Sequence, residues 1–137
     1  MYIVETEITS TRIAEIFSSA FFDVSDITDV GFSVRGSAFL ISVHVDVPRK
    51  TIAFSDISQL HHISTAEALI ICNDLNRKTN LFRAWLLTVP DKVVIALDYQ
   101  MTFEREVSPF HVVSVFRRFD RLATQAVHTV LQSYLAP

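Results

Sequence analysis

The residues of this sequence that could take part in chemistry show no catalytic or metal-binding pattern. His61 and His62 are neighbours, and neighbouring histidines rarely converge on one metal ion. His111 and His128 share a predicted helix, but they lie much farther apart than the three or four residues that separate a zinc-binding pair. We therefore expect no metal ion, no cofactor and no enzyme activity.

The other reactive side chains fit structural roles better than catalytic ones. Cys72 lies in the apolar stripe of a predicted helix, so we expect a buried and inert thiol. The spacing of Asp23, Asp26 and Asp29 does not match a calcium-binding loop, which favours a role in surface solubility. The chain has only two glycines, so a glycine-rich phosphate loop is excluded.

The segment "ALIICNDLNRKTNLFRAWLLTV" (residues 68–89) passes from an apolar helix into a strand without a glycine between them. Asn73 and Asn76 lie on one side of that helix, near its end. We expect Asn76 or Asn80 to end the helix, by bonding free carbonyl groups or by adopting the left-handed conformation that asparagine tolerates. Asn73 is expected to bond the backbone of a loop. The alternative is that these asparagines contact a ligand.

Composition limits the class of protein. The chain has 137 residues, of which 50% are hydrophobic and 20% are charged, which suits one domain (residues 1–137) with a well-filled core. The net charge of −3 and the lack of a basic patch argue against a nucleic-acid-binding protein. No apolar run is long enough to span a membrane, and "MYIVETEITS" lacks the apolar core of a signal peptide. Together with the single cysteine, these features indicate a cytoplasmic protein.

Apolar periodicity and turn residues predict an α+β domain built on an antiparallel sheet. Ser64 and Glu67 fit a capping box at the start of the second helix, and Ser108 is expected to cap the last one. The expected order is α-β-β-β-α-β-β-α, with helices at 10–20, 64–77 and 109–135, strands within 29–36, 37–47 and 50–55, and a hairpin over 81–101.

Turn chemistry predicts how the strands pair. A two-residue loop at Gly36-Ser37 places Val34 opposite Phe39. In the later hairpin, a turn at "VPDK" places Ala84 opposite Leu97. Both registers put apolar residues together on one face of the sheet, which a slip of one residue would destroy.

The later hairpin is also apolar on the face that points away from the core. On that side Arg83 is expected to face Asp98 as a cross-strand charge pair. We expect helix 64–77 to cover this face, because a sheet with two apolar faces needs a layer on each. The alternative is a surface for a protein partner or for a second copy of the chain. The apolar residues expected there are Trp85, Leu87, Val94, Ala96 and, from an earlier strand, Leu40.

Three stretches of the chain resemble the YbjN family. They read "LIICNDLNRKTNLFRAWL", "KVVIALDYQM" and "VSPFHVVSVFRRFDRLATQAV". The shared marks are a helix that ends in N-x-x-N, the strand after it, and a last helix that opens with serine. The resemblance covers residues 10–132 and is strongest over 63–120. Two glycines usual in the family are absent, since "SSAFFDV" ends the first helix and "FEREVSP" precedes the last.

The resemblance implies a fold like that of type III secretion chaperones and a role as a candidate bacterial sensory transduction regulator, with no established biochemistry. Such chaperones are small, acidic, cytoplasmic and usually dimeric, and they bind unfolded stretches of a protein. We therefore expect a non-enzymatic protein-binding module that has a protein partner, forms a homodimer, and binds neither nucleic acid nor membrane. The alternative is a small-molecule sensor or enzyme, because eleven phenylalanines could line an apolar pocket between sheet and helices.

Overall fold

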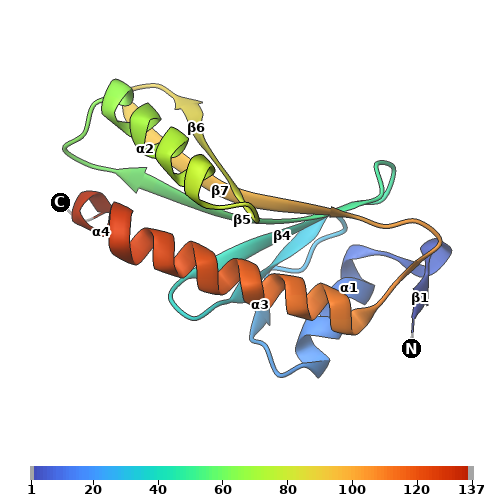
Figure 1. Ribbon diagram of the computed structural model, residues 1–137. Helices are drawn as coiled ribbons and strands as arrows, with labels where there is room; N and C mark the ends of the chain where they lie inside the picture. Colours follow the sequence, from blue (N-terminus) through green and yellow to red (C-terminus); the bar gives the residue numbers. More distant parts are fainter. Residues whose placement is uncertain (1, 136–137) are drawn as a thin grey trace.

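The computed structural model describes residues 2–135, which form an antiparallel sheet with helices on one face (Figure 1). The α+β class and the order of the larger elements are confirmed. Three strands of two residues each were not predicted, because strands this short carry no periodicity. The elements are β1 (Ile3–Val4), a 3-10 turn (Glu5–Glu7), α1 (Ser10–Ser19), β2 (Val24–Ser25), β3 (Gly31–Arg35), β4 (Leu40–Asp46), β5 (Thr51–Leu60), α2 (Thr65–Lys78), β6 (Arg83–Val89), β7 (Lys92–Thr102), β8 (Glu106–Val107), α3 (Pro109–Ala126), a π-helical segment (Val127–Leu131) and α4 (Gln132–Leu135).

The main sheet contains six strands in the order β2-β3-β4-β5-β7-β6, while β1 and β8 pair separately. Every pairing is antiparallel. β5 pairs with β7 along its whole length, as far as Leu60 opposite Val93. The pairing of β5 with β4 stops earlier, at Ser55 opposite Ser42. Residues 56–60 of β5 therefore extend beyond the ladder that β4 forms.

One cluster of buried side chains joins α1, α2 and α3 to one face of the sheet, which we call the core face. Phe17 of α1 lies at its centre, with ring centroids 4.9 Å from Phe116, 5.7 Å from Phe32 and 6.4 Å from Phe54. Tilted and edge-on aromatic pairs of this kind add to the stability that burial alone provides. These phenylalanines fill the core beneath the sheet.

The predicted pairing of the β3–β4 hairpin is wrong by two residues. Val34 pairs with Ile41, not with Phe39, because the turn centres on Ser37-Ala38. The side-chain period of a strand is two residues, so the shift leaves Val34 on the predicted face. The predicted β6–β7 register is confirmed, with Ala84 opposite Leu97.

A carboxylate from α3 fixes the β3–β4 turn. Asp120 accepts hydrogen bonds from the amide of Ser37, at 3.0 and 3.1 Å, and from its hydroxyl, at 2.8 Å. A Cβ atom on Gly36 would lie 2.5 Å from Oδ1 of Asp120. Gly36 is therefore needed for this close approach, and not for the positive φ that the predicted turn assumed.

Ser64 and Ser108 cap their helices as predicted, but the Glu67 carboxylate bonds the Ser64 hydroxyl instead of the Ser64 amide that a full capping box requires. The Ser64 hydroxyl accepts a hydrogen bond from the amide of Glu67 at 3.1 Å and lies at the same distance from its carboxylate. Ser108 caps α3 by accepting a bond from the amide of His111.

None of the helices in residues 2–135 combines the length and the apolar character needed to cross a membrane.

The helix α1 ends with a non-glycine residue at the left-handed position. Phe21 has φ of 68°, and the amide of Phe22 bonds the carbonyl of Phe17 at 3.0 Å. This is the Schellman arrangement, in which glycine usually occupies the left-handed position. Arg105, in the stretch before the last helix, also adopts a left-handed conformation, with φ of 65°.

Phe21→Gly is expected to stabilise the protein by about 0.5–1 kcal/mol. Glycine removes the strain of a side chain at positive φ, and this gain exceeds the loss from its greater freedom in the unfolded chain. No packing is lost, since Phe21 is 99% exposed. Urea unfolding of the variant measures the effect, with Phe21→Ala as the control that keeps Cβ and the strain. A variant no more stable than the wild type would show that the exposed ring contributes to folding.

Candidate functional site

The face of the sheet opposite the core carries the residues that the sequence placed there. We call it the outer face. Trp85 and Leu87 are half-buried, Val94 and Ala96 are 9% and 1% exposed, and Leu40 is 45% exposed. The prediction that the second helix covers this face is wrong. The buried residues of α2 (Ala68, Cys72 and Leu75) belong to the cluster on the core face, and no other helix within residues 2–135 packs on the outer face.

The apolar residues of the outer face line up across neighbouring strands. Trp85 of β6 stands opposite Ala96 of β7, which in turn stands opposite Ile57 of β5. Leu40, at the start of β4, falls opposite Ile57 when the β4–β5 register is extended by two residues. Both residues line one cleft at the end of β4. Val94 and Ala96 are buried although no helix covers them, since they stand between the larger side chains of adjacent strands. The result is an apolar strip that crosses four strands.

Sequence reasoning missed Ile57, which is 57% exposed. The sequence predicts that the third strand ends at Ser55, whereas the strand continues to Leu60. Asp56 interrupts the apolar alternation, and the residues Ile57, Ser58, Gln59 and Leu60 do not alternate with a period of two, so the extension carries no strand pattern.

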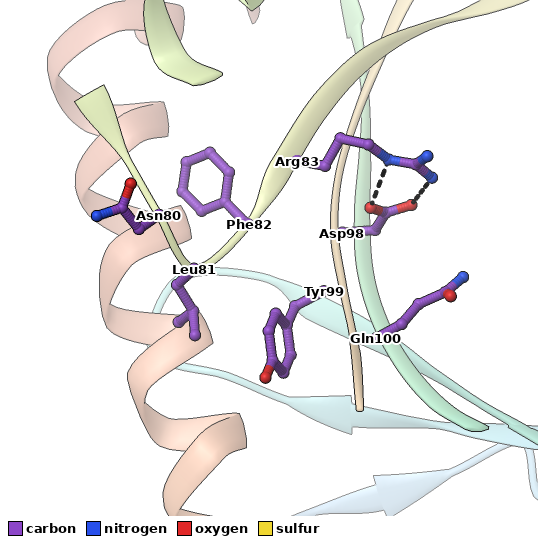
Figure 2. A pocket seen from close by; sticks show the side chains of 7 residues that line it. All are labelled: Asn80, Leu81, Phe82, Arg83, Asp98, Tyr99 and Gln100. Atoms are coloured by element: carbon purple, nitrogen blue, oxygen red, sulfur yellow. Dashed lines mark hydrogen bonds and ion pairs between the residues drawn. The ribbon is translucent and has the colours of Figure 1, made fainter. Parts of the chain in front are cut away.

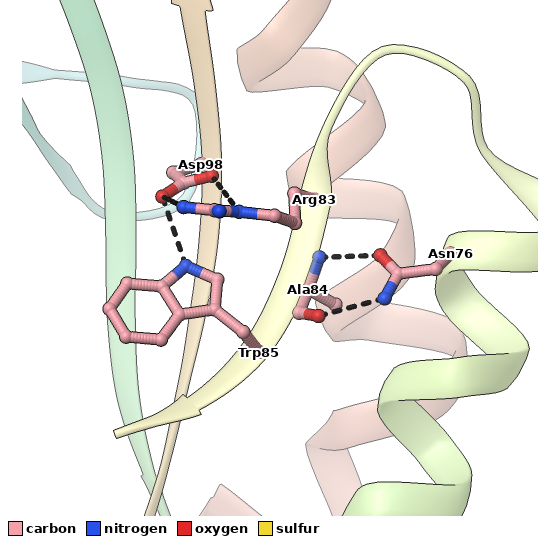
Figure 3. A network of polar contacts seen from close by, with 5 residues as sticks. All are labelled: Asn76, Arg83, Ala84, Trp85 and Asp98. Atoms are coloured by element: carbon pink, nitrogen blue, oxygen red, sulfur yellow. Dashed lines mark hydrogen bonds and ion pairs between the residues drawn. The ribbon is translucent and has the colours of Figure 1, made fainter. Parts of the chain in front are cut away.

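A polar cluster fixes the tryptophan at one end of the strip (Figure 3). The indole N–H of Trp85 donates to Oδ2 of Asp98 at 2.9 Å. Arg83 donates to both oxygens of the same carboxylate, at 3.2 and 3.0 Å, so the predicted cross-strand pair is confirmed. The Asp98 carboxylate also raises the pKa of the Arg83 guanidinium above its ordinary value, mainly through these hydrogen bonds. The guanidinium lies 5.3 Å from the Trp85 ring, and three side chains thereby hold one another in place.

A hollow of about 290 Å³ adjoins this cluster at the start of β6 (Figure 2). Arg83 and Asp98 border it on one side, and Tyr99 approaches it from the other. Its remaining lining residues are Asn80, Leu81, Phe82 and Gln100. The hollow is small and open, so it extends the surface beside the tryptophan without forming an enclosed ligand cavity.

Asn76 does not end its helix as predicted. Its side-chain oxygen accepts a hydrogen bond from the amide of Ala84 at 2.7 Å, and its amide nitrogen donates to the Ala84 carbonyl at 2.9 Å (Figure 3). β6 is an edge strand, so the asparagine occupies the backbone groups that another strand would otherwise bond. Thr79 follows the helix in an extended conformation and Asn80 has no positive φ, so the predicted left-handed stop is wrong. Asn73 is exposed, and its side chain bonds no loop backbone within residues 2–135, contrary to the prediction. The asparagine contact joins two elements, which local sequence patterns do not reveal.

The other candidate residues form no second site. Cys72 is buried as predicted, and burial raises the pKa of its thiol. His61 and His62 lie in the link between β5 and α2, with ring centroids 6.5 Å apart. Within residues 2–135, no three His, Cys, Asp or Glu side chains come together in a way that could hold a metal ion.

Comparison with solved structures confirms the predicted fold. YbjN, a candidate transcription regulator from E. coli, superposes with a TM-score of 0.78 at 10% sequence identity, over 93% of this chain and 95% of its own. The type III secretion chaperone SycH from Yersinia pestis, solved in complex with a fragment of YscM2, gives a TM-score of 0.56 at 16% identity, over 87% of this chain and 97% of its own. No family model and no curated protein sequence matches the chain. At these identities the likeness establishes a fold shared with YbjN and with the chaperone.

Proposed function

We propose that this chain is a non-enzymatic protein-binding module, with a chaperone-like or regulatory role, and that it binds a protein partner on its outer face. The observation that carries the proposal is the apolar strip Leu40–Ile57–Ala96–Trp85, over which no helix of the described chain packs. Apolar surface that is gathered in one continuous patch is typical of protein interaction sites.

The Trp85 cluster supports the same proposal. Tryptophan and arginine are the residues that most often dominate the energy of protein interfaces. Trp85 and Arg83 are fixed by hydrogen bonds to Asp98 before any partner arrives, so little side-chain freedom remains to be lost on binding. Arg83 is 64% exposed at its side chain and can also bond a partner's carboxylate or carbonyl groups.

The shared fold adds to the argument. The chaperone SycH has this fold and was solved with a bound protein fragment. We extend the binding of a protein segment to this chain, and we place it on the outer face because of the exposed apolar strip. YbjN, described as a candidate transcription regulator, is compatible with a regulatory outcome of such binding.

Trp85→Glu is expected to weaken partner binding at least about tenfold, because it replaces the largest apolar side chain of the strip with a charge. The protein would be isolated at native expression level, and the stoichiometry of each co-purifying protein would be compared between wild type and variant. Thr11→Glu is the matched control, since Thr11 is exposed on α1, which packs on the core face and not on the outer face.

The proposal requires a near-stoichiometric partner that Trp85→Glu loses and Thr11→Glu keeps. Circular dichroism of both variants must show a folded protein. If Trp85→Glu unfolds, Leu87→Glu on the same face takes its place. A partner retained by all of these variants would place the binding surface elsewhere on the molecule.

We also propose that the chain forms a homodimer. The low charged fraction and the fold shared with a secretion chaperone support this state. Three surfaces could supply the contact: α2 with its exposed Leu69 and Ile70, the outer face, and α3. Light scattering after size-exclusion chromatography would give the mass, and a monomer at tens of micromolar would contradict the proposal.

A small-molecule sensor is the second candidate function. One observation favours it: a cleft of about 670 Å³ lies between β5 and the C-terminal end of the last helix. Its volume falls in the range typical of small-molecule sites. The aromatic core itself supplies no such cavity, because the buried phenylalanines pack on one another.

A further inference from the structure

The cleft contains the one carboxylate that the structure buries against the core face. Asp56 is 6% exposed and stands in β5 opposite Leu97, between the positions of the buried residues Phe54 and Leu60. Its single hydrogen-bond partner within the described chain is the hydroxyl of Ser58, at 3.3 Å. No lysine or arginine side chain pairs with it in residues 2–135. A buried carboxylate without a cation is unfavourable, and folded proteins retain such groups mainly where they have a task.

A ligand can reach the Asp56 carboxylate from the side of β5 that faces β4. β4 stops pairing with β5 at Ser55, so the chain beyond it is not covered by a neighbouring strand on that side. The last helix closes the far side, and α4 is tied to the end of β5 by a hydrogen bond from the amide of His61 to the carbonyl of Tyr134. The cleft of about 670 Å³ lies between these walls.

The lining of the cleft combines a large apolar surface with few polar groups. The apolar part is formed by Ala38, Phe39, Leu40, Ile57, Val127 and Leu135. The polar groups besides Asp56 and Ser58 are Thr124, His128 and Gln132. A pocket built in this way binds an apolar body and orients it through a small number of polar contacts.

Part of the wall is an unusual helix. Val127 and His128 belong to the π-helical segment that separates α3 from α4. Single π-helical turns inside α-helices are rare and occur often at functional sites. The π-helical segment and the buried carboxylate are therefore two independent features of one cleft, and both are typical of a functional site.

We propose that the cleft between β5 and the last helix binds a small organic cation, an amine attached to an apolar body, with Asp56 as the counter-ion of the amine. The amine supplies the positive charge that the protein itself does not place beside Asp56. The apolar body occupies the surface formed by Phe39, Val127 and Leu135. An anionic ligand is disfavoured, because its charge would meet the carboxylate.

This site shares Leu40 and Ile57 with the proposed protein-binding surface, but the two sites differ in their polar residues. Trp85 and Asp98 do not line the cleft. A defect in one function can therefore be separated from a defect in the other. Trp85→Glu should leave ligand binding unchanged, and Asp56→Asn should leave partner binding unchanged.

Three probes that share one apolar body test the proposal: 4-phenylbutylammonium, 4-phenylbutanol and 4-phenylbutyrate. Binding would be measured at pH 7.5 from amide chemical shifts, with saturable changes expected at Ser58, Thr124 and His128. We expect the ammonium compound to bind at least about tenfold more tightly than the carboxylate, with the alcohol between them, since a hydrogen bond to a charged group is worth this much. In Asp56→Asn the ammonium compound should bind no more tightly than the alcohol.

Asp29→Asn is the matched control, because it removes one negative charge from an exposed position outside the cleft. The preference for the ammonium compound must survive in Asp29→Asn and in Trp85→Glu. Equal affinities for the three probes, no saturable shifts at the cleft residues, or a preference that persists in Asp56→Asn would each overturn the proposal.

A pH series gives a second test on the unmodified protein. Burial raises the pKa of Asp56 to about 6, so the carboxylate is ionised at pH 7.5 and largely neutral at pH 5. The preference for the ammonium compound over the alcohol, two probes whose charge does not change over this range, should fall as the pH is lowered. His128 also lines the cleft. Asp120 is a further charged group at this side of the cleft, because its carboxylate accepts a hydrogen bond from the lining residue Thr124 at 3.3 Å. His128→Gln isolates the contribution of Asp56, and an unchanged preference at pH 5 in that variant would contradict the assignment.

Discussion

Asp56→Asn is expected to raise the free energy of unfolding at pH 7.5 by up to about 3 kcal/mol. Burial raises the pKa of Asp56 from 3.8 to about 6 in the folded protein, while the hydroxyl of Ser58 lowers it by a smaller amount. One pKa unit corresponds to about 1.4 kcal/mol, so the folded state disfavours the ionised carboxylate by about 3 kcal/mol at neutral pH. Asparagine has nearly the same shape and no charge, and it can still bond Ser58.

The sign of the effect follows from linkage. The folded protein binds the proton of Asp56 more tightly than the unfolded chain does, so the wild type loses stability as the pH rises from about 4 to about 6. The difference between Asp56→Asn and the wild type should therefore be near zero at pH 4 and reach its maximum above pH 7. Urea unfolding of both proteins at several pH values measures it, and groups present in both cancel in the difference. A difference that does not vary with pH would mean that the carboxylate is not desolvated in the folded protein.

A variant that gains this much stability would also bear on function. Proteins retain destabilising polar groups where activity needs them, and replacement of such groups commonly stabilises the fold at the expense of function. We expect Asp56→Asn to combine higher stability with loss of the ammonium preference. Higher stability with intact ligand discrimination would separate the two effects and leave the carboxylate without a role.

Phe17→Ala is expected to lower the free energy of unfolding by about 3–5 kcal/mol, the range measured for truncation of buried aromatic residues. Phe17 is fully buried, and its ring contacts those of Phe22, Phe32, Phe54 and Phe116. The substitution leaves a cavity where α1 and α3 meet the sheet, and neighbouring rings cannot all move to fill it. Because total stabilities of small domains are only about 5–15 kcal/mol, the variant should be close to the limit of folding.

The change in stability would be followed by urea unfolding with circular dichroism and with the fluorescence of Trp85, the only tryptophan of the chain. Phe110→Ala is the matched control, because it removes the same atoms from a side chain that is 82% exposed. It should change the free energy of unfolding by less than about 0.5 kcal/mol. Similar losses in the two variants would contradict the position of Phe17 at the centre of the core.

The sequence alone determined the features that depend on neighbouring residues. The alternation in 83–89 and 92–102 and the turn residues at Pro90-Asp91 were enough to place Arg83 opposite Asp98, and the structure has that pair. The Ser64 cap was visible because a serine and a glutamate three residues apart satisfy the first turn of a helix locally. Register and caps of this kind are decided within one hairpin or one helical turn.

Where a distant group intervened, sequence reasoning failed. The β3–β4 turn is positioned by Asp120, which lies 83 residues from Ser37 along the chain. Asn76 bonds the edge of β6 and leaves the end of its own helix to the backbone. Asp56 interrupts the apolar alternation of β5, so the strand was expected to end before Ile57. Asp120 and Asn76 bond groups of another secondary-structure element, and Asp56 lies in a cleft that the last helix helps to form.

The face on which α2 packs was also decided only by the tertiary structure. Periodicity showed that Ala68, Cys72 and Leu75 are buried, but an amphipathic stripe does not identify the surface that it meets. Both faces of the β6–β7 hairpin are apolar, so the apolar stripe of α2 could have been buried against either face. In the folded protein the stripe joins the core that α1 and α3 already form, and this leaves the strip around Trp85 uncovered within the described chain. The sequence thus determined which residues are apolar and how they alternate, whereas long-range packing decided which of the two apolar faces became core and which remained available as a surface.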